Sequence, residues 1–277
     1  MEKFIVAAIQ LNSQDKKEEN LENMVAFIEE AINRGASLIA MPEMVNYLGP
    51  DIQENAEEIP YGVTFKTIAE QAKKHRVWIH CGSIAEKNSQ DSRPYNTTMI
   101  INPQGELVVK YRKLHTFDVD IKDGPKVKES DRICPGDDII TIATQKVGHL
   151  GLSICYDIRF GEIFRLMALK GAQIFLAPAN FTLNTGKDHW EPLLRARSIE
   201  NSCYTIAPAQ CGSKYQFHAY GKSMIIDPWG NVIAKASDKP CVITAEIDLE
   251  YLQSVRNQVF TLENRRTDVY TIKNKEK

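Results

Sequence analysis

Three residues whose chemical types together suit acyl transfer follow predicted buried strands. Glu43 ends the apolar run ASLIAMPE, Lys113 ends ELVVKYRK, and Cys155 ends HLGLSIC. Near-continuous apolar runs are typical of strands buried on both faces, and in open α/β folds reactive groups gather beyond the carboxyl ends of such strands. A thiol, a carboxylate and an ammonium supply the nucleophile, the base and the cation that cleavage of an amide bond requires. The sequence therefore predicts a thiol-dependent acyl-transfer site.

Each member of this set has a definite expected task. Only the thiolate attacks a carbonyl, so Glu43 is expected to take the proton of Cys155. The attack places negative charge on the carbonyl oxygen, which Lys113 and the backbone N–H of Tyr156 are expected to stabilise. Ammonia or an amine then leaves, and a thioester remains on the cysteine. Water activated by Glu43 hydrolyses that thioester.

Taken one at a time, these residues also have ordinary explanations. A free Cys often packs as a small hydrophobe, a Glu after Pro is often a solvated loop residue, and a Lys within YRK is usually exposed. A second interpretation pairs Cys155 with His115 or His189, although the local signatures of papain-like and caspase-like proteases are absent from the sequence. A third treats the chain as a non-enzymatic scaffold, which has no physical reason to keep all three residues.

Apolar β-rich runs alternate with amphipathic helical runs in both halves of the chain. The first half predicts strand, helix, strand, helix, strand and a hairpin at 4–11, 19–35, 36–43, 61–75, 77–84 and 96–113. The second half repeats that order at 149–155, 161–171, 172–178, 188–201, 203–210 and 220–236. Two face-to-face sheets with helices outside satisfy this order in one α/β domain, residues 1–277. The polar segment from about Tyr251 shows no obvious core face and is expected to form a tail.

The composition indicates a globular protein that acts on a small molecule. Among 277 residues, 34 Lys+Arg balance 36 Asp+Glu, and no long run of one sign predicts nucleic-acid or membrane binding. No apolar run reaches the roughly 18 residues of a membrane span, so a cytoplasmic location is expected. The six cysteines are widely spaced without a CxxC pair, which favours reduced thiols. No metal and no cofactor is expected, because neither His nor Cys spacing forms a ligand set.

The contexts MPEM, YRKLH and ICYDIRF resemble, in this order, the Glu, Lys and Cys motifs of the nitrilase, or carbon–nitrogen hydrolase, superfamily. The resemblance runs from FIVAAIQL to RRTDVY, nearly the whole chain. It implies a four-layer αββα sandwich and a homodimer or higher homo-oligomer. It also implies that Glu129, in KVKESDRICPGD, is the second glutamate that family members use to position substrate or to support the lysine.

Longer strings resemble the Nit subgroup, which contains omega-amidases and deaminated-glutathione amidases. These strings are LHTFDVDI, CYDIRFGE, TGKDHWEPLLRARSIEN and YGKSMIIDPWG. Both kinds of substrate have a carboxylate at a 2-oxoglutarate-like end, and Arg159, four residues past the nucleophile, is expected to bind it bidentately. Alternatively, Arg159 forms a salt bridge that orients the Asp157 loop. The resemblance also places Asn180, Phe181 and Thr182 on the pocket wall.

The substrate itself stays open at this level. A nitrilase proper, an N-carbamoyl amino-acid hydrolase and a small aliphatic amidase use the same three residues. Only the shape and the charge of the pocket separate these activities, and neither can be read from the sequence. The sequence therefore predicts an amidase for a small carboxylate-bearing substrate and leaves these relatives as alternatives.

Overall fold

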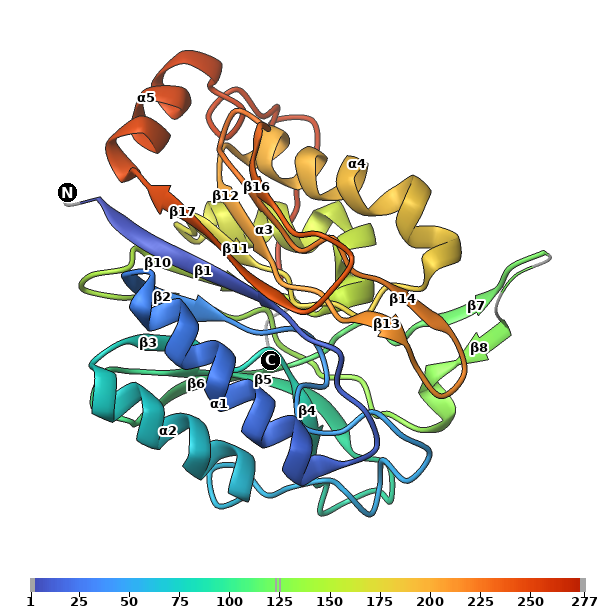
Figure 1. Ribbon diagram of the computed structural model, residues 1–277. Coiled ribbons are helices and arrows are strands. Elements are labelled where there is room, and N and C mark those ends of the chain that lie inside the picture. Colours follow the sequence, from blue (N-terminus) through green and yellow to red (C-terminus); the bar gives the residue numbers. More distant parts are fainter. Residues whose placement is uncertain (1–2, 123, 125, 275–277) are drawn as a thin grey trace.

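The computed structural model describes residues 3–122, 124 and 126–274 as four stacked layers, helix, sheet, sheet, helix (Figure 1). The first sheet has the strand order β17-β1-β2-β3-β5-β4, with β6 paired to β5. Its strands are β17 (Cys241–Ile247), β1 (Phe4–Gln10), β2 (Ala36–Ala40), β3 (Trp78–His80), β5 (Tyr95–Ile101), β4 (Ile84–Glu86) and β6 (Leu107–Arg112). Helices α1 (Lys17–Asn33) and α2 (Val63–His75) cover its outer face.

The second sheet repeats this arrangement with the second half of the chain. It has the order β16-β15-β12-β11-β10-β9. The strands are β16 (Val232–Lys235), β15 (Met224–Ile226), β12 (Tyr204–Ala207), β11 (Ile174–Leu176), β10 (His149–Leu152) and β9 (Thr141–Ala143). Helices α3 (Gly161–Leu169) and α4 (Leu183–Asn201) lie on its outer side (Figure 1). The αββα sandwich expected from the sequence is therefore confirmed.

Strand β1 shows why the central strands are apolar at nearly every position. Successive side chains of a strand point to opposite faces. Val6 and Ala8 belong to the core cluster between the sheets, whereas Ala7 and Ile9 belong to the cluster beneath α1 and α2. Fully burying each large aliphatic side chain contributes about 1.5–3 kcal/mol, so a strand with two buried faces stabilises two layers at once.

The C-terminal segment differs from its prediction. The expected boundary near Tyr251 falls inside helix α5 (Leu249–Val259). Leu252 and Val255 are buried on this helix, and Leu252 joins the core cluster between the sheets. Asp248 caps the helix by accepting hydrogen bonds from the N–H groups of residues 250 and 251. The expectation of no core face is therefore wrong for this part of the segment.

Two short hairpins and two single turns of 3₁₀ helix lie outside the sheets and build the site. The hairpins are β7 (Asp118–Asp120) with β8 (Lys126–Lys128) and β13 (Cys211–Ser213) with β14 (His218–Tyr220). The helical turns are η1 (Glu129–Asp131) and η2 (Cys155–Arg159). Neither hairpin is predicted by the sequence pattern. Helix α4 also begins at Leu183, five residues before the predicted start at 188.

Candidate active site

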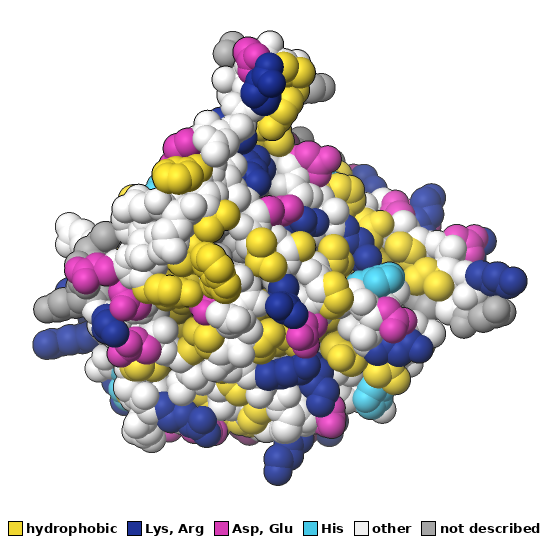
Figure 2. All heavy atoms as spheres, turned by 90° about the horizontal axis from the view of Figure 1, so that it is seen from above, with side chains coloured by type: hydrophobic (Ala, Val, Ile, Leu, Met, Phe, Trp, Pro, Cys, Tyr) yellow, Lys and Arg dark blue, Asp and Glu magenta, His cyan; other side chains and the backbone are white. Residues whose placement is uncertain are grey.

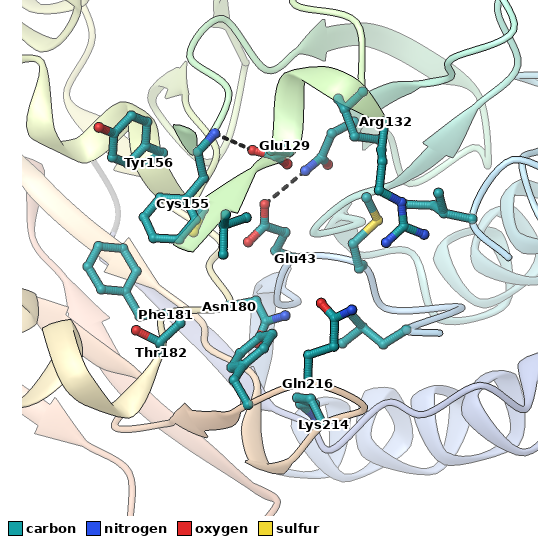
Figure 3. Close-up of a pocket in the computed structure, with 18 of the residues that line it drawn as sticks. Glu43, Glu129, Arg132, Cys155, Tyr156, Asn180, Phe181, Thr182, Lys214 and Gln216 are labelled. Carbon is teal, nitrogen blue, oxygen red and sulfur yellow. Dashed lines mark hydrogen bonds between the residues drawn. The ribbon is translucent and has the colours of Figure 1, made fainter. Parts of the chain in front are cut away.

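The structure brings Glu43, Lys113 and Cys155 together beyond the strand ends, as predicted. Glu43 lies three residues past β2, Lys113 follows β6 directly, and Cys155 begins η2 after β10. Lys113 Nζ lies 3.0 Å from Glu43 Oε1, and their side chains are only 2% and 6% exposed. Strands of both sheets therefore contribute to one buried constellation (Figure 3).

The backbone at Cys155 turns sharply and presents the thiol at the end of the strand. Its φ is +50°, a left-handed conformation that non-glycine residues rarely adopt. Its N–H donates to the carbonyl of Pro178 at 2.8 Å, which ties the turn to the end of the neighbouring strand β11. The Glu43 carboxylate and the backbone of Asn180 both lie close enough to the thiol to influence its pKa. The predicted nucleophile therefore lies beside the predicted base.

Burial and the nearby Glu43 carboxylate raise the pKa of the Cys155 thiol well above its usual value, and Lys113 opposes them only partly. The resting group is therefore a thiol, and its activation requires a base. Burial alone lowers the pKa of Lys113, but the carboxylates of Glu129 and Glu43 raise it well above the ordinary value. Lys113 accordingly remains a fixed positive charge beside the nucleophile.

Glu129 meets Lys113 as expected. Its Oε1 and Oε2 lie 3.0 and 2.9 Å from the ammonium. Its Oε2 also accepts a hydrogen bond from the N–H of Phe117, which holds the carboxylate in one orientation. Lys113 is therefore clamped between two carboxylates, Glu43 and Glu129, and each has further donors of its own.

Two amide side chains that the sequence analysis missed hold Glu43. Asn96, in β5, donates from Nδ2 to Glu43 Oε1 at 2.8 Å. Gln210, beyond β12, donates from Nε2 to the backbone carbonyl of Glu43 at 2.9 Å and to Ser13 Oγ at 2.9 Å. Gln210 lies beyond a strand end like the predicted residues, whereas Asn96 lies at the beginning of its strand. An uncharged amide at such a position, however, carries no sequence signal of its own.

Asp157 organises the loop of the nucleophile. It is fully buried and accepts from the Tyr111 hydroxyl at 2.6 Å and from the N–H of Ile154 at 2.8 Å. It also lies 2.7 Å from His115 Nδ1, and the His115 ring stacks on Phe160 with centroids 3.6 Å apart. His115 is therefore a structural histidine. This histidine orients Asp157, in place of the salt bridge with Arg159 that was the alternative from the sequence.

Above the constellation lies a cavity of about 350 Å³. The predicted residues that line it are Glu43, Lys113, Glu129, Cys155, Tyr156, Asn180, Phe181 and Thr182. Further side chains come from the β7–β8 hairpin, from η1 and its flanks, and from the turn of the β13–β14 hairpin. Neither His115 nor His189 belongs to the lining among the described residues. The geometry accordingly gives the Cys–His interpretation no support.

Arg159 is the one predicted site residue that does not line the cavity in the described part of the chain. Its guanidinium carbon lies 5.3 Å from the ring centroid of Phe181 and 5.7 Å from that of Tyr156, within cation–π range. Its Nη1 lies 3.2 Å from His189 Nδ1. Arg159 therefore packs behind two lining rings, and its binding of a substrate carboxylate stays a prediction.

Within the described residues, no group of three or more His, Cys, Asp or Glu side chains is arranged to hold a metal ion. None of the described helices is both long and apolar enough to cross a membrane.

The family model for carbon–nitrogen hydrolases matches residues 5–257. The chain belongs to this family. This carbon–nitrogen hydrolase is 39% identical over 270 residues to a deaminated glutathione amidase of Synechocystis, covering 96% of this chain and 99% of the relative. It is also 39% identical over 279 residues to omega-amidase NIT2 of Xenopus tropicalis, covering 99% of both.

A solved structure agrees with these relatives. Saccharomyces cerevisiae Nit3, a member of branch 10 of the nitrilase superfamily, is 32% identical with a TM-score of 0.85, covering 95% of this chain and 97% of that one. The carbon–nitrogen hydrolase described here is therefore an amidase of the nitrilase superfamily, with the αββα fold of that superfamily. The resemblance to this superfamily, which the motifs around Glu43, Lys113 and Cys155 indicated, is confirmed.

Proposed function

We propose that this hydrolase cleaves the amide of a small 2-oxo carboxylic acid through a thioester on Cys155. The observation that carries the proposal is the position of Glu43. Its carboxylate lies 3.0 Å from Lys113 Nζ and close enough to the Cys155 thiol to raise the pKa of that thiol, so a base and a cation meet at the nucleophile. A proton acceptor and a fixed positive charge are needed at the same moment, when the thiol attacks and the oxyanion forms.

The reaction follows from this geometry. Glu43 takes the thiol proton as Sγ bonds to the carbonyl carbon, and Lys113 with the N–H of Tyr156 stabilises the resulting oxyanion. When the C–N bond breaks, the Glu43 carboxyl gives its proton to the departing nitrogen. Water then donates a proton to Glu43 and attacks the thioester carbonyl. The acid product leaves, and the proton returns to the Cys155 sulfur.

The lining of the cavity supports an amide substrate. Asn180 Oδ1 is buried and has no hydrogen-bond partner among the described residues. A primary or secondary amide carries an N–H that this oxygen accepts, which removes the cost of an unsatisfied buried acceptor. The hydroxyl of Thr182 and the rings of Tyr156 and Phe181 complete this wall. These residues are proposed to hold the acyl half, with Arg159 supporting the two rings.

The relatives' names define the substrates to test first: α-ketoglutaramate for an omega-amidase, and deaminated glutathione. Both yield 2-oxoglutarate, so one assay for that product serves for each. We expect release of 2-oxoglutarate by the purified protein and its loss in Cys155→Ala, by at least about a thousandfold. Cys241→Ala is the matched control, because Cys241 lies in β17 and outside the cavity lining.

Two results would contradict the proposal. Turnover of Cys155→Ala above about one part in a thousand of wild type would exclude the thioester. The substrate would belong to another branch of the superfamily if the protein hydrolysed neutral amides, N-carbamoyl compounds or nitriles but released no 2-oxoglutarate from either substrate.

Arg159→Ala tests the predicted carboxylate contact, since it should lower kcat/KM for carboxylate-bearing substrates much more than for neutral amides. Equal losses on both would reject that contact.

A homodimer and a cytoplasmic location are further parts of the proposal. Lys and Arg side chains are interspersed with Asp and Glu on the face in Figure 2, and apolar side chains lie exposed between them. Ile199 of α4 and Trp229 of the β15–β16 turn are 47% and 53% exposed, which supports association with a second copy. Light scattering on the purified protein tests the dimer.

The proposed cytoplasmic location is supported by the cysteines. All six are free, which suits a reducing compartment. Cell fractionation tests the location.

A further inference from the structure

A second cavity, of about 290 Å³, lies between helix α3 and the chain that follows α5. After α5 the chain returns to the second half of the molecule (Figure 1), where Arg165 of α3 donates from Nη1 to the carbonyl of Thr261 at 3.2 Å. No described residue lines both this cavity and the catalytic one. The residues that line the second cavity are Arg165, Thr261, Asn264, Arg265, Tyr270 and Ile272. A ligand bound there is therefore separate from the amide substrate.

The lining of the second cavity is positively charged. It contains two arginines, Arg165 and Arg265, and no Asp or Glu among the described residues. The carboxylate that acts on the charge of Arg165 is Glu200, which does not line the cavity. The Oε1 atom of Glu200 is bound by Arg197 Nη1 at 2.8 Å. The second cavity therefore favours a negatively charged ligand.

The two guanidinium groups lie close enough to act on each other. Burial lowers the pKa of Arg165, Glu200 opposes this effect, and the charge of Arg265 lowers the pKa further. Like charges that are partly withdrawn from water repel each other more strongly than they do in water. An anion between the two arginines replaces this repulsion with attraction to both.

Arg165 is anchored at the cavity, whereas Arg265 keeps most of its donors. The Nη1 and Nη2 atoms of Arg165 donate to the carbonyls of Thr261 and Glu200, and its Nε has no acceptor among the described residues. Arg265 donates from Nε to the carbonyl of Leu262 at 3.0 Å. Neither Nη group of Arg265 has an acceptor in the part of the chain that the structure describes. The arginine fork of Arg265 is therefore positioned and still able to bind a ligand.

Uncharged donors complete the lining. The side chains of Asn264 and Tyr270 are exposed and form no hydrogen bond among the described residues, so the cavity is open to solvent beside an amide and a hydroxyl. A phosphate group carries three strong acceptor oxygens, which donors can approach from several directions. Two guanidinium groups with an amide and a hydroxyl suit such a group better than a planar carboxylate, which one fork satisfies.

We propose that Arg165 and Arg265 form a binding site for a phosphate group, with Asn264 and Tyr270 as further donors. The ligand is inorganic phosphate or a phosphate monoester, because both present the same oxygens to the two arginines. The bound group links the chain after α5 to helix α3. This inference goes beyond the proposed function and does not depend on it, since none of the catalytic residues lines the second cavity.

The first test uses the wild-type protein at full length and does not depend on any variant folding. Calorimetric titrations with inorganic phosphate, phenyl phosphate and malonate are compared with sodium chloride at the same ionic strength, because salt screens such contacts. We expect a Kd below about 1 mM for at least one of the two phosphates. Tighter binding of phenyl phosphate identifies a monoester as the ligand, and tighter binding of inorganic phosphate identifies the free ion. Binding of malonate as tight as that of either phosphate, or binding of neither phosphate, would overturn the inference.

The second test assigns the site to Arg265. Arg265→Gln should raise the Kd for phosphate at least about tenfold, because charge-assisted hydrogen bonds are lost. Arg265→Lys keeps the charge without the fork and should give a Kd between those of wild type and the Gln variant. Arg266→Gln is the matched control, since Arg266 is exposed, pairs with Asp268 at 2.7 Å and lies outside the described lining. Equal Kd values for wild type, Arg265→Gln and the control would reject the assignment.

Alkylation of Cys155 separates the second cavity from the catalytic one, whose lining also contains cations. Phosphate bound in the second cavity should leave the rate at which iodoacetamide alkylates Cys155 unchanged, as measured by mass spectrometry. Phosphate bound in the catalytic cavity would slow this reaction, and Arg265→Gln would not relieve the effect. That second result would overturn the inference, and neither result requires an active amidase.

Discussion

Lys113 and Glu43 form a buried ion pair beside Cys155, with Nζ 3.0 Å from Oε1. Removal of one partner from such a pair leaves an unpaired charge in a low-dielectric site, which costs several kcal/mol. Here the second carboxylate, Glu129, lies 2.9 Å from the same ammonium. Glu43 can therefore accept a proton during the reaction without leaving Lys113 unpaired.

Glu43→Gln should change the reactivity of Cys155 and the turnover in opposite directions. The Glu43 carboxylate is one cause of the raised pKa of the thiol, so its neutral replacement lowers that pKa. Alkylation of Cys155 by iodoacetamide at pH 8 should become faster than in wild type, while amide hydrolysis falls by at least about a hundredfold. Mass spectrometry and the 2-oxoglutarate assay measure the two effects. A variant that alkylates faster and also acylates at the wild-type rate would rule out Glu43 as the base.

Glu129→Gln should move the alkaline limb of the pH–activity profile to lower pH. The Glu129 carboxylate is the largest of the influences that raise the pKa of Lys113 against the opposing effect of burial. Without it, the ammonium loses its proton at lower pH, and oxyanion stabilisation is lost with it. Asp131→Asn is the control, since Asp131 forms an ion pair with exposed Lys128 and with no other cation among the described residues. Coincident profiles of wild type and Glu129→Gln would contradict this role.

The Lys113–Glu129 ion pair predicts how the stability of the fold depends on pH. Because the pKa of Lys113 in the folded protein lies above the ordinary 10.5, its charge stabilises the fold fully below about pH 10.5. That contribution is lost as the pH rises through the folded-state pKa. Thermal unfolding between pH 9 and pH 12 should show a smaller loss for Glu129→Gln than for wild type. A larger loss in the variant would reverse the assigned sign.

Asp157→Ala should destabilise the fold, although Asp157 does not belong to the described lining of the cavity. The change leaves the buried Tyr111 hydroxyl, the Ile154 N–H and the His115 ring without their common acceptor. Unsatisfied buried donors cost about 1–3 kcal/mol each, so a fall in Tm of at least about 5 °C is expected. Calorimetry measures this, with Asp188→Ala at an exposed position of α4 as the control. Equal Tm values for both variants would contradict the role of Asp157.

His115→Asn and His189→Asn should each keep turnover within about tenfold of wild type. Neither residue belongs to the described lining of the cavity, and His115 is engaged by Asp157 and Phe160. A Cys–His hydrolase would lose at least about a thousandfold when its base is removed. The 2-oxoglutarate assay on both variants decides between the two mechanisms, and a thousandfold loss in either would favour the histidine.

Much of the fold could be predicted from the sequence, because each central strand is apolar on two faces and each helix on one. The alternation of these runs predicted the four layers and the two hairpins β5–β6 and β15–β16. The small hairpins β7–β8 and β13–β14 could not be predicted, since three-residue strands outside the core have no apolar pattern. Helix α5 was missed because the predicted boundary at Tyr251 separated Leu249 from Leu252 on its buried face.

The sequence by itself determined the identity of the chemistry. Glu43 and Cys155 follow largely buried strands, and Lys113 follows the part-exposed strand β6. Because strand ends converge in an α/β fold, local patterns were sufficient to predict these three positions. Only the tertiary structure decided which other side chains complete the site. Asn96 and Gln210 reach Glu43 from distant strands, and among the arginines it is Arg132 that lines the cavity while Arg159 packs behind two rings. The physical reason is that the contacts of a polar side chain depend on which segments the core brings beside it, and chain spacing does not encode that choice.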